Sequence, residues 1–244
     1  LHYCLSQHPK LVNGIPKEIH FFNREIYYDK NDKWYESHFK SIKSDALFFE
    51  STPAYLYQPG TARLIYNLYP NIKLVAILRD PIYRAYSAWN HYRDLFDKGS
   101  IQSIKNTNRS PGNFLYELLY KGRDRFPSFR ECIDMELELI NFRTDCFEPS
   151  LLRRGLYLSQ LQNYWNYFDR SNIKIIGFHH FIKNMDDAVN EILHFINLNL
   201  EHDNMFSIKN KKAKGVKKYK CPMNEDDMLL LEDFYKKPNI DFNN

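Results

Sequence analysis

An unbroken apolar stretch at residues 74–78 constrains the fold of this chain most. The sequence Leu-Val-Ala-Ile-Leu has the length of a strand and no polar position, which predicts a strand covered on both faces in a parallel sheet. Arg79 follows directly, Asp80 suits the N-cap of a helix, and Pro81 suits its first turn. Because α/β proteins bind anions where a strand leads into a helix, this segment predicts a phosphate site.

Two side chains of this segment are candidates for that anion. At 3.6 residues per turn, Ser87 falls on one face of the predicted helix with Arg84 and His91. The guanidinium of Arg79 and the hydroxyl of Ser87 could therefore converge on one phosphate. The competing interpretation is that Arg79 pairs with a carboxylate and that Ser87 is a small residue at a helix contact.

The remaining pattern alternates between strands and helices. Further strands are predicted at residues 19–22, 47–49 and 173–178. Helices are predicted at residues 61–68, 114–120, 129–142, 156–168, 188–195 and 225–235, and the polar residues 97–112 are expected to form a loop. This alternation predicts an α/β fold, a three-layer domain in which a central parallel sheet is flanked by helices.

Length and composition fit one folded domain over residues 1–244. The chain is 43% hydrophobic and 16% aromatic, which is enough for a sizeable core and excludes disorder of the whole chain. No apolar run reaches the length of a membrane span, so we expect no membrane segment in this chain.

One basic tract accounts for the positive charge. Seven lysines lie within residues 209–220, and removing them from the net charge of +4 leaves −3 for the rest of the chain. A solvated loop and a nucleic-acid patch are two interpretations of such a tract. The cysteines, Cys4, Cys132, Cys146 and Cys221, show no spacing typical of metal ligands, and we expect no metal site.

Five segments in the same order resemble one family. Arg79-x-Pro-x-x-Arg-x-x-Ser-x-Trp89 resembles the 3'-phosphate-binding segment of sulfotransferases that use 3'-phosphoadenosine 5'-phosphosulfate (PAPS). The other four, residues 17–22 (Lys-Glu-Ile-His-Phe-Phe), 49–55, 154–157 and 231–239, are similar to segments of heparan sulfate sulfotransferases and their bacterial relatives. The resemblance implies a sulfotransferase fold related to the P-loop nucleotide hydrolases.

The resemblance also implies roles for residues 17–20. Sulfuryl transfer requires a group that takes the proton of the attacking hydroxyl or amine. Glu18 stands where the heparan sulfate enzymes have their catalytic glutamate, and His20 is the alternative base, since some sulfotransferases use histidine. Alternation along the predicted strand places Glu18 and His20 on one face and Lys17 on the other. The competing interpretations are an exposed Glu18 paired with Lys17 or Arg24, and a structural His20.

For the donor, the resemblance implies that Arg79 and Ser87 hold the 3'-phosphate of PAPS. The lysine tract then corresponds to the family's loop that closes over the donor, with Lys214, Gly215, Val216 and Lys217 as its candidate binding residues. The family often has Lys-Gly-Arg there, whereas this chain has Lys-Gly-Val, so Lys214 and Lys217 are the candidates for the missing cation. The implied product is adenosine 3',5'-bisphosphate (PAP), and no metal is required.

The family's glycine-rich loop for the 5'-phosphosulfate has no counterpart in this sequence. We expect that loop and the first strand to lie upstream of Leu1. The expected acceptor is a small metabolite or a saccharide, and the expected location is the cytoplasm, with a Golgi luminal domain of a tethered enzyme as the alternative. A nucleotide- or nucleic-acid-binding module and a kinase-like phosphoryl transferase are the competing functions.

Overall fold

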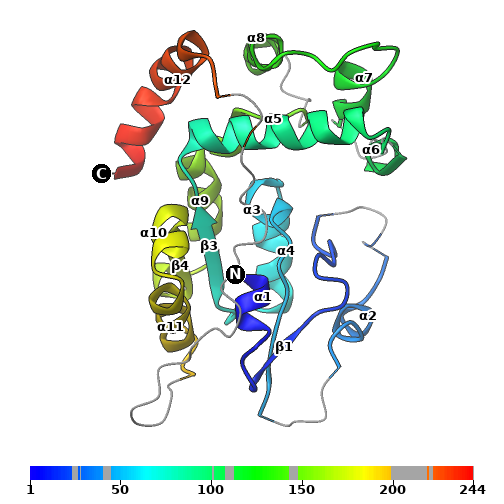
Figure 1. The fold of residues 1–244 in the computed structure, drawn as a ribbon. Helices are drawn as coiled ribbons and strands as arrows, with labels where there is room; N and C mark the ends of the chain where they lie inside the picture. Colours follow the sequence, from blue (N-terminus) through cyan, green and yellow to red (C-terminus); the bar gives the residue numbers. More distant parts are fainter. Residues whose placement is uncertain are drawn as a thin grey trace. The chain divides into compact units, whose positions relative to one another are not determined.

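The computed structural model describes residues 1–23, 27, 29–40, 45–100, 102–107, 113–142, 148–198, 219 and 222–243 (Figure 1). The chain divides into two compact units. The first comprises Leu1–Leu78 and Gln160–Val216, and the second comprises Arg79–Ser159 and Lys217–Asn244. The single domain expected from the sequence stays a prediction.

The first unit contains four described strands, which pair in parallel. Strand β1 (Leu11–Asn13) pairs with β2 (Leu47–Phe49), and β3 (Leu74–Leu78) pairs with β4 (Ile173–Gly177). The predicted α/β class with parallel strands is confirmed. In the described residues, however, these strands form two two-stranded sheets.

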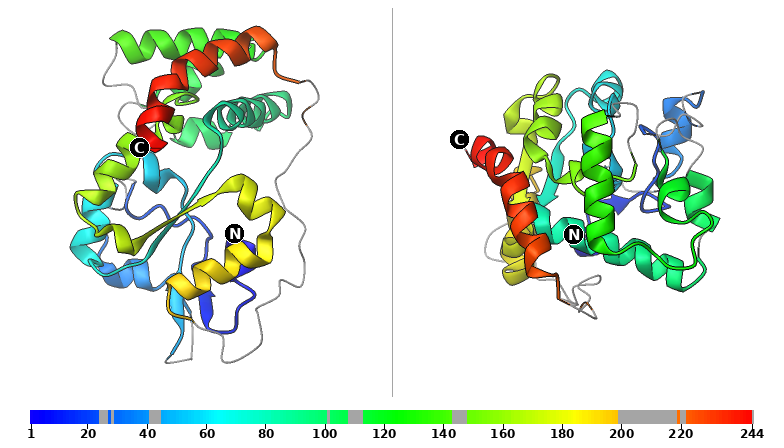
Figure 2. Two further views of the ribbon diagram at one scale, coloured as in Figure 1. Left: turned by 90° about the vertical axis from the view of Figure 1, so that its left-hand side faces the viewer. Right: turned by 90° about the horizontal axis from the view of Figure 1, so that it is seen from above.

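Helices cover both faces of the β3–β4 sheet. Leu74 and Ile173 pack into a cluster with residues of α4 (Thr61–Leu68) and α9 (Tyr157–Trp165). Val75, Ile77 and Ile176 pack instead with α1 (His2–Leu5), α10 (Phe178–Lys183) and α11 (Met185–Phe195), which lie beside the sheet in Figures 1 and 2. The apolar run therefore forms the predicted strand with helices packed on both faces, although four of its five residues are half-buried rather than buried.

Residues 19–22 do not form the predicted strand. Ile19 and His20 are irregular, and a turn follows them. The N–H groups of Ile19 and His20 bond to the side chains of Glu50 and Thr52 rather than to a neighbouring strand. The apolar residues of this segment are all buried in an aromatic cluster. Their apolar character therefore reflects burial on all sides and does not indicate the alternation of a strand.

Other short elements of the first unit were not predicted. They are β1, α10, α2 (Asp32–Glu36), α3 (Ala54–Tyr57) and the 3₁₀ turn η3 (Arg170–Asn172). Asn31 caps α2 by accepting a hydrogen bond from the backbone N–H of Trp34 at 3.0 Å.

The second unit is built from helices in the described residues. These are α5 (Pro81–Asp97), α6 (Gln102–Thr107), α7 (Leu115–Leu119), α8 (Phe129–Phe142), the 3₁₀ turn η2 (Arg153–Gly155) and α12 (Glu225–Asn243). Helix α6 lies inside the segment predicted as a loop, and α12 continues through Pro238 beyond its predicted end at residue 235. Trp89, Ile133, Leu152 and Tyr235 lie in the common core.

Gly155 occupies a position in that core where no side chain fits. A Cβ atom there would lie 2.6 Å from the hydroxyl oxygen of Tyr235 and 2.8 Å from the Cβ of Pro81. Tyr235 cannot retreat easily, because it is fully buried and its hydroxyl donates to the Leu152 carbonyl at 2.6 Å. We expect Gly155→Ala to lower the free energy of unfolding by about 1–3 kcal/mol, measured by urea titration.

Gly177→Ala is the matched control for this substitution. No described atom lies within 4 Å of its added Cβ, and the φ of −68° suits any residue. Gly177→Ala should change the free energy of unfolding by no more than about 0.5 kcal/mol. Equal unfolding midpoints for wild type and Gly155→Ala would contradict the packing argument.

Candidate active site

A carboxylate with two basic neighbours lies in the first unit, between β1 and β2 in the sequence. The Nζ of Lys17 lies 3.1 Å from Oε1 of Glu18, and Nε2 of His20 lies 3.6 Å from Oε2. The Glu18 side chain is 39% exposed, so another molecule can reach it. The structure thus brings together the three catalytic candidates, although through an irregular segment and not through strand alternation.

The imidazole of His20 is held from both sides. Its backbone has a φ of 61°, in the left-handed region, and its Nδ1 lies 3.1 Å from Oδ1 of Asn23. Because an amide oxygen can only accept, Nδ1 is the donor in that contact. Nε2 lies 3.6 Å from Oε2 of Glu18, which is beyond hydrogen-bond distance, so the contact between these two side chains is electrostatic.

His2 is a further histidine of this region that the sequence did not single out. Its Nδ1 lies 2.9 Å from Oγ of Ser51, and the backbone N–H of Ser51 donates to the Lys17 carbonyl at 3.2 Å. Burial, and next the charge of Lys17, lowers the pKa of His2 below its usual value. His2 is therefore a neutral imidazole near neutral pH. No spacing pattern connects it with Glu18.

The candidate phosphate segment lies at the start of α5, in the second unit. Oδ1 of Asp80 accepts hydrogen bonds from the N–H groups of Ile82 and Tyr83 at 2.9 and 3.1 Å, which confirms the predicted cap. An anion here cannot use those N–H groups while Asp80 holds them. Binding of an anion must therefore depend on side chains, and the candidates are Arg79 and the half-buried Ser87.

Tyrosines hold Arg79 in place. The hydroxyl of Tyr157 donates to the Arg79 carbonyl at 2.7 Å, and Nη1 of Arg79 donates to the hydroxyl of Tyr219 at 3.4 Å. The ring of Tyr219 packs edge-on against Tyr86 of α5 at 5.1 Å. Ser87 lies six residues after Pro81 in α5, about 9 Å farther along the helix axis.

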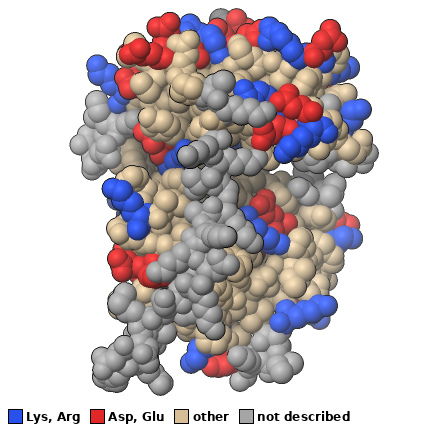
Figure 3. All heavy atoms as spheres, in the orientation of Figure 1, with Lys and Arg blue, Asp and Glu red and all other residues tan. Residues whose placement is uncertain are grey.

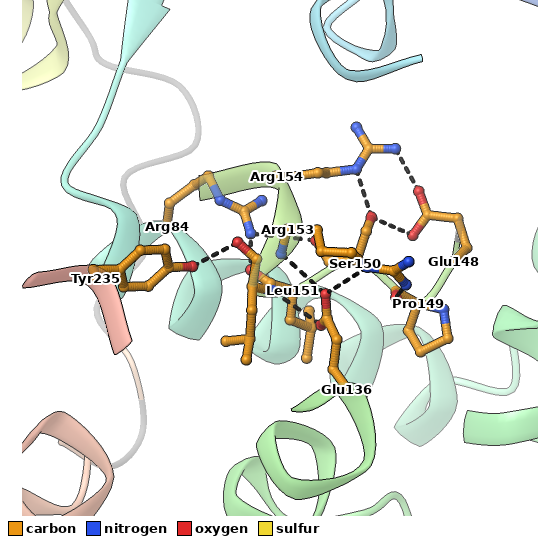
Figure 4. A network of polar contacts seen from close by, with 10 residues as sticks. Arg84, Glu136, Glu148, Pro149, Ser150, Leu151, Arg153, Arg154 and Tyr235 are labelled. Atoms are coloured by element: carbon orange, nitrogen blue, oxygen red, sulfur yellow. Dashed lines mark hydrogen bonds and ion pairs between the residues drawn. The ribbon is translucent and has the colours of Figure 1, made fainter. Parts of the chain in front are cut away.

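Arg84 has a structural role in this segment. Figure 4 shows its guanidinium donating to the Leu151 carbonyl. The hydroxyl of Tyr235 donates to the carbonyl of the next residue, Leu152. The carboxylate of Glu136 accepts from the N–H groups of Leu152 and Arg153 at 2.9 and 3.0 Å, and burial raises its pKa. This network fixes the turn before α9 against α5 and α8.

The other half of the predicted donor site lies outside the described residues. It comprises Lys214, Gly215, Val216 and Lys217. On the face drawn in Figure 3, Lys and Arg side chains are interspersed with Asp and Glu over the described residues. Among these residues, no group of three or more His, Cys, Asp or Glu side chains could hold a metal ion, and no helix is both long and apolar enough to cross a membrane.

Comparison with known proteins decides the family. The sulfotransferase domain family matches residues 61–237, which is more than two thirds of the chain. The chain belongs to the sulfotransferase family. The matched region contains Arg79 and Ser87 and begins after Glu18, so the family match does not include the candidate base.

Individual sulfotransferases align over almost the whole chain. The membrane-associated sulfotransferase kil1 of Dictyostelium discoideum is 25% identical over 300 residues, an alignment that covers 98% of this sulfotransferase and 60% of kil1. The bifunctional heparan sulfate N-deacetylase/N-sulfotransferase 4 of Mus musculus is 24% identical over 266 residues, covering 99% of this chain and 27% of the relative. This sulfotransferase therefore spans only part of these relatives.

A solved structure shows the same fold. The crystal structure of a sulfotransferase from Alicyclobacillus acidocaldarius matches with a TM-score of 0.67 and 24% identity, covering 97% of this chain and 85% of the other. This likeness confirms the sulfotransferase fold predicted from the sequence.

Proposed function

We propose that this sulfotransferase moves the sulfuryl group of PAPS to a hydroxyl or amine of a saccharide or small metabolite, with Glu18 as the general base. The observation that carries the proposal is the accessible Glu18 carboxylate with the His20 imidazole 3.6 Å away. The 3.1 Å contact of Glu18 with Lys17 is also what an ordinary exposed ion pair would show, so it does not distinguish the two interpretations. An attacking hydroxyl or amine must lose a proton, and an accessible carboxylate with oriented neighbours suits that task.

Lys17 and His20 are the neighbours that orient the Glu18 carboxylate in this proposal, at 3.1 and 3.6 Å. His20, whose side chain is 17% exposed, is the alternative base.

Arg79 and Ser87 recognise the 3'-phosphate of the donor. PAPS, when bound, supplies an activated sulfuryl group and leaves as PAP. The side chains fit a phosphate: Arg79 offers a fork of donors and Ser87 offers a hydroxyl. Asp80 already binds the free N–H groups at the start of α5, so specificity for a phosphate depends on the side chains of Arg79 and Ser87. Lys214, Gly215, Val216 and Lys217 are proposed to close over the donor.

A saccharide acceptor is supported by the names of the relatives, several of which act on heparan sulfate. A small metabolite stays the second candidate. The cytoplasmic location inferred from the sequence stays a prediction, with the Golgi lumen as its alternative.

Thermal unfolding in the presence of nucleotides tests the donor assignment. PAP should raise the unfolding temperature far more than ATP or AMP, because only PAP carries the 3'-phosphate that Arg79 and Ser87 would bind. At a ligand concentration of 100 times Kd, the expected stabilisation is about 2.7 kcal/mol. The measurement is differential scanning fluorimetry of the protein with each nucleotide at equal concentration.

Other outcomes of this measurement point to the competing functions. Equal shifts with the three nucleotides would overturn the donor assignment. A preference for ATP with magnesium would favour a kinase-like transferase. Binding of nucleic acid that falls steeply with salt, without selectivity for PAP, would favour a nucleic-acid-binding module.

A further inference from the structure

The carboxylate of Glu50 binds four donors beside the candidate base. Its Oε1 accepts from the hydroxyls of Tyr35 and Tyr55 at 2.9 and 2.8 Å. Its Oε2 accepts from the hydroxyl of Thr52 at 2.7 Å and from the backbone N–H of Ile19 at 3.3 Å. The four donors together use both oxygens of the carboxylate.

Two of these contacts act on the backbone between Glu18 and His20. The N–H of Ile19 is bound by Glu50, and the N–H of His20 is bound by the hydroxyl of Thr52 at 3.4 Å. Thr52 in turn donates to Glu50, so both backbone contacts depend on one carboxylate. No strand ladder holds this segment, and these bonds take the place of one.

The segment needs such a support because its backbone is strained. A φ of 61° at His20 costs a residue other than glycine of the order of 1 kcal/mol, and such conformations persist where the surroundings impose them. The surroundings here are closely packed: Tyr35 and Thr52 are buried, and the ring of Tyr35 stacks on Phe21 at 5.0 Å.

The hydroxyl partners of Glu50 stay protonated. Burial, and next the charge of Glu50, raises the pKa of Tyr35 and of Tyr55 well above the usual value of a phenol. Both tyrosines therefore remain donors throughout the pH range in which an enzyme of this kind works.

We propose that Glu50 is a positioning residue, which sets the direction of the Glu18 carboxylate by holding the backbone N–H groups of Ile19 and, through Thr52, of His20. This inference rests on the proposed role of Glu18 as the base. Glu50 itself takes no proton from the acceptor.

Glu50→Gln tests this inference, because an amide places an NH₂ group where a donor now points. We expect kcat to fall by about ten- to hundredfold, as for a lost hydrogen bond to a charged group, while the affinity for PAP stays within about twofold. The activity probe is transfer of labelled sulfate from PAPS to N-deacetylated, desulfated heparan sulfate, which offers both amines and hydroxyls. Amide hydrogen exchange at Ile19 is measured on the same variant and should become faster.

Tyr55→Phe is the matched control. It removes a donor to Oε1 and the long contact of the Tyr55 hydroxyl with the N–H of Phe22 at 3.5 Å, and it leaves the contacts of Oε2 with Ile19 and Thr52 in place. We expect this variant to lose stability but to keep kcat within about twofold and to keep slow exchange at Ile19. If both variants lost kcat in proportion to their loss of unfolding temperature, Glu50 would be structural only and the inference would be wrong.

Glu18→Gln in the same assay separates this inference from the proposed function. Wild-type turnover in Glu50→Gln together with inactive Glu18→Gln would overturn the positioning role and leave the base in place. Full activity of Glu18→Gln would overturn the base assignment. Should heparan sulfate not be an acceptor, unchanged exchange at Ile19 in Glu50→Gln would still overturn the inference.

Discussion

Glu18→Gln should reduce sulfuryl transfer by about 10²- to 10⁴-fold and leave the affinity for PAP nearly unchanged. The amide keeps the size of the side chain but cannot take a proton from the acceptor, and general base catalysis typically contributes a factor of this magnitude. The measurement is kcat for transfer of labelled sulfate from PAPS, together with a PAP titration of the same variant. A fall in kcat without a change in PAP binding assigns Glu18 to the chemical step.

Asp29→Asn is the control for this substitution. Asp29 is an exposed carboxylate that lies 3.5 Å from its neighbour Lys30, much as Glu18 lies beside Lys17. Removing its charge should change kcat by less than about twofold, as for an ordinary surface pair. Wild-type turnover in Glu18→Gln would transfer the role of the base to His20 or to another group.

Arg79→Ala should weaken PAP binding by about ten- to hundredfold, because a charge-assisted bond to the 3'-phosphate is lost. Binding of AMP, which lacks that phosphate, should change much less. Calorimetric titration of each variant with PAP and with AMP measures the difference. Arg79→Lys should recover only part of the affinity, since a lysine cannot form the two parallel bonds of a guanidinium.

Arg93→Ala on the same helix is the control for charge. Arg93 packs over the ring of Trp89 at 4.4 Å and donates to Asn90 at 2.9 Å. Its loss removes one positive charge from α5, and we expect it to leave the preference for PAP over AMP intact. Equal losses of PAP and AMP affinity in Arg79→Ala would show that Arg79 does not read the 3'-phosphate.

The sequence predicted those parts of the fold that local chemistry determines. Residues 74–78 form the predicted strand, Asp80 caps α5, and Pro81 begins it, since each depends on side chains within a few positions. The segment from Ile19 was assigned wrongly as a strand because the partners of its N–H groups, Glu50 and Thr52, lie 31 and 32 positions away.

The candidate site was predicted only in part, because some of its contacts also join residues that are far apart in the sequence. Glu18 was found through its resemblance to a family motif, and its proximity to His20 was expected from an alternation that does not exist. The contacts of His2 with Ser51 and of Tyr157 with Arg79 join residues 49 and 78 positions apart. No periodicity in a single sequence carries such information, because these contacts arise only from tertiary folding.

The pairing of β3 with β4 has a consequence for the time course of synthesis. Leu11 pairs with Leu47, 36 positions later, whereas Leu74 pairs with Ile173, 99 positions later. The longer loop costs only about 1 kcal/mol more in closure entropy, so its effect on stability is small. At a translation rate of about 5–20 residues per second, however, roughly 5–20 seconds pass between the synthesis of β3 and the synthesis of β4, its partner strand. During that interval the unpaired edge of this apolar strand can pair with a strand of another chain, which favours aggregation. A nascent chain whose synthesis stops before residue 173 would retain this unpaired edge.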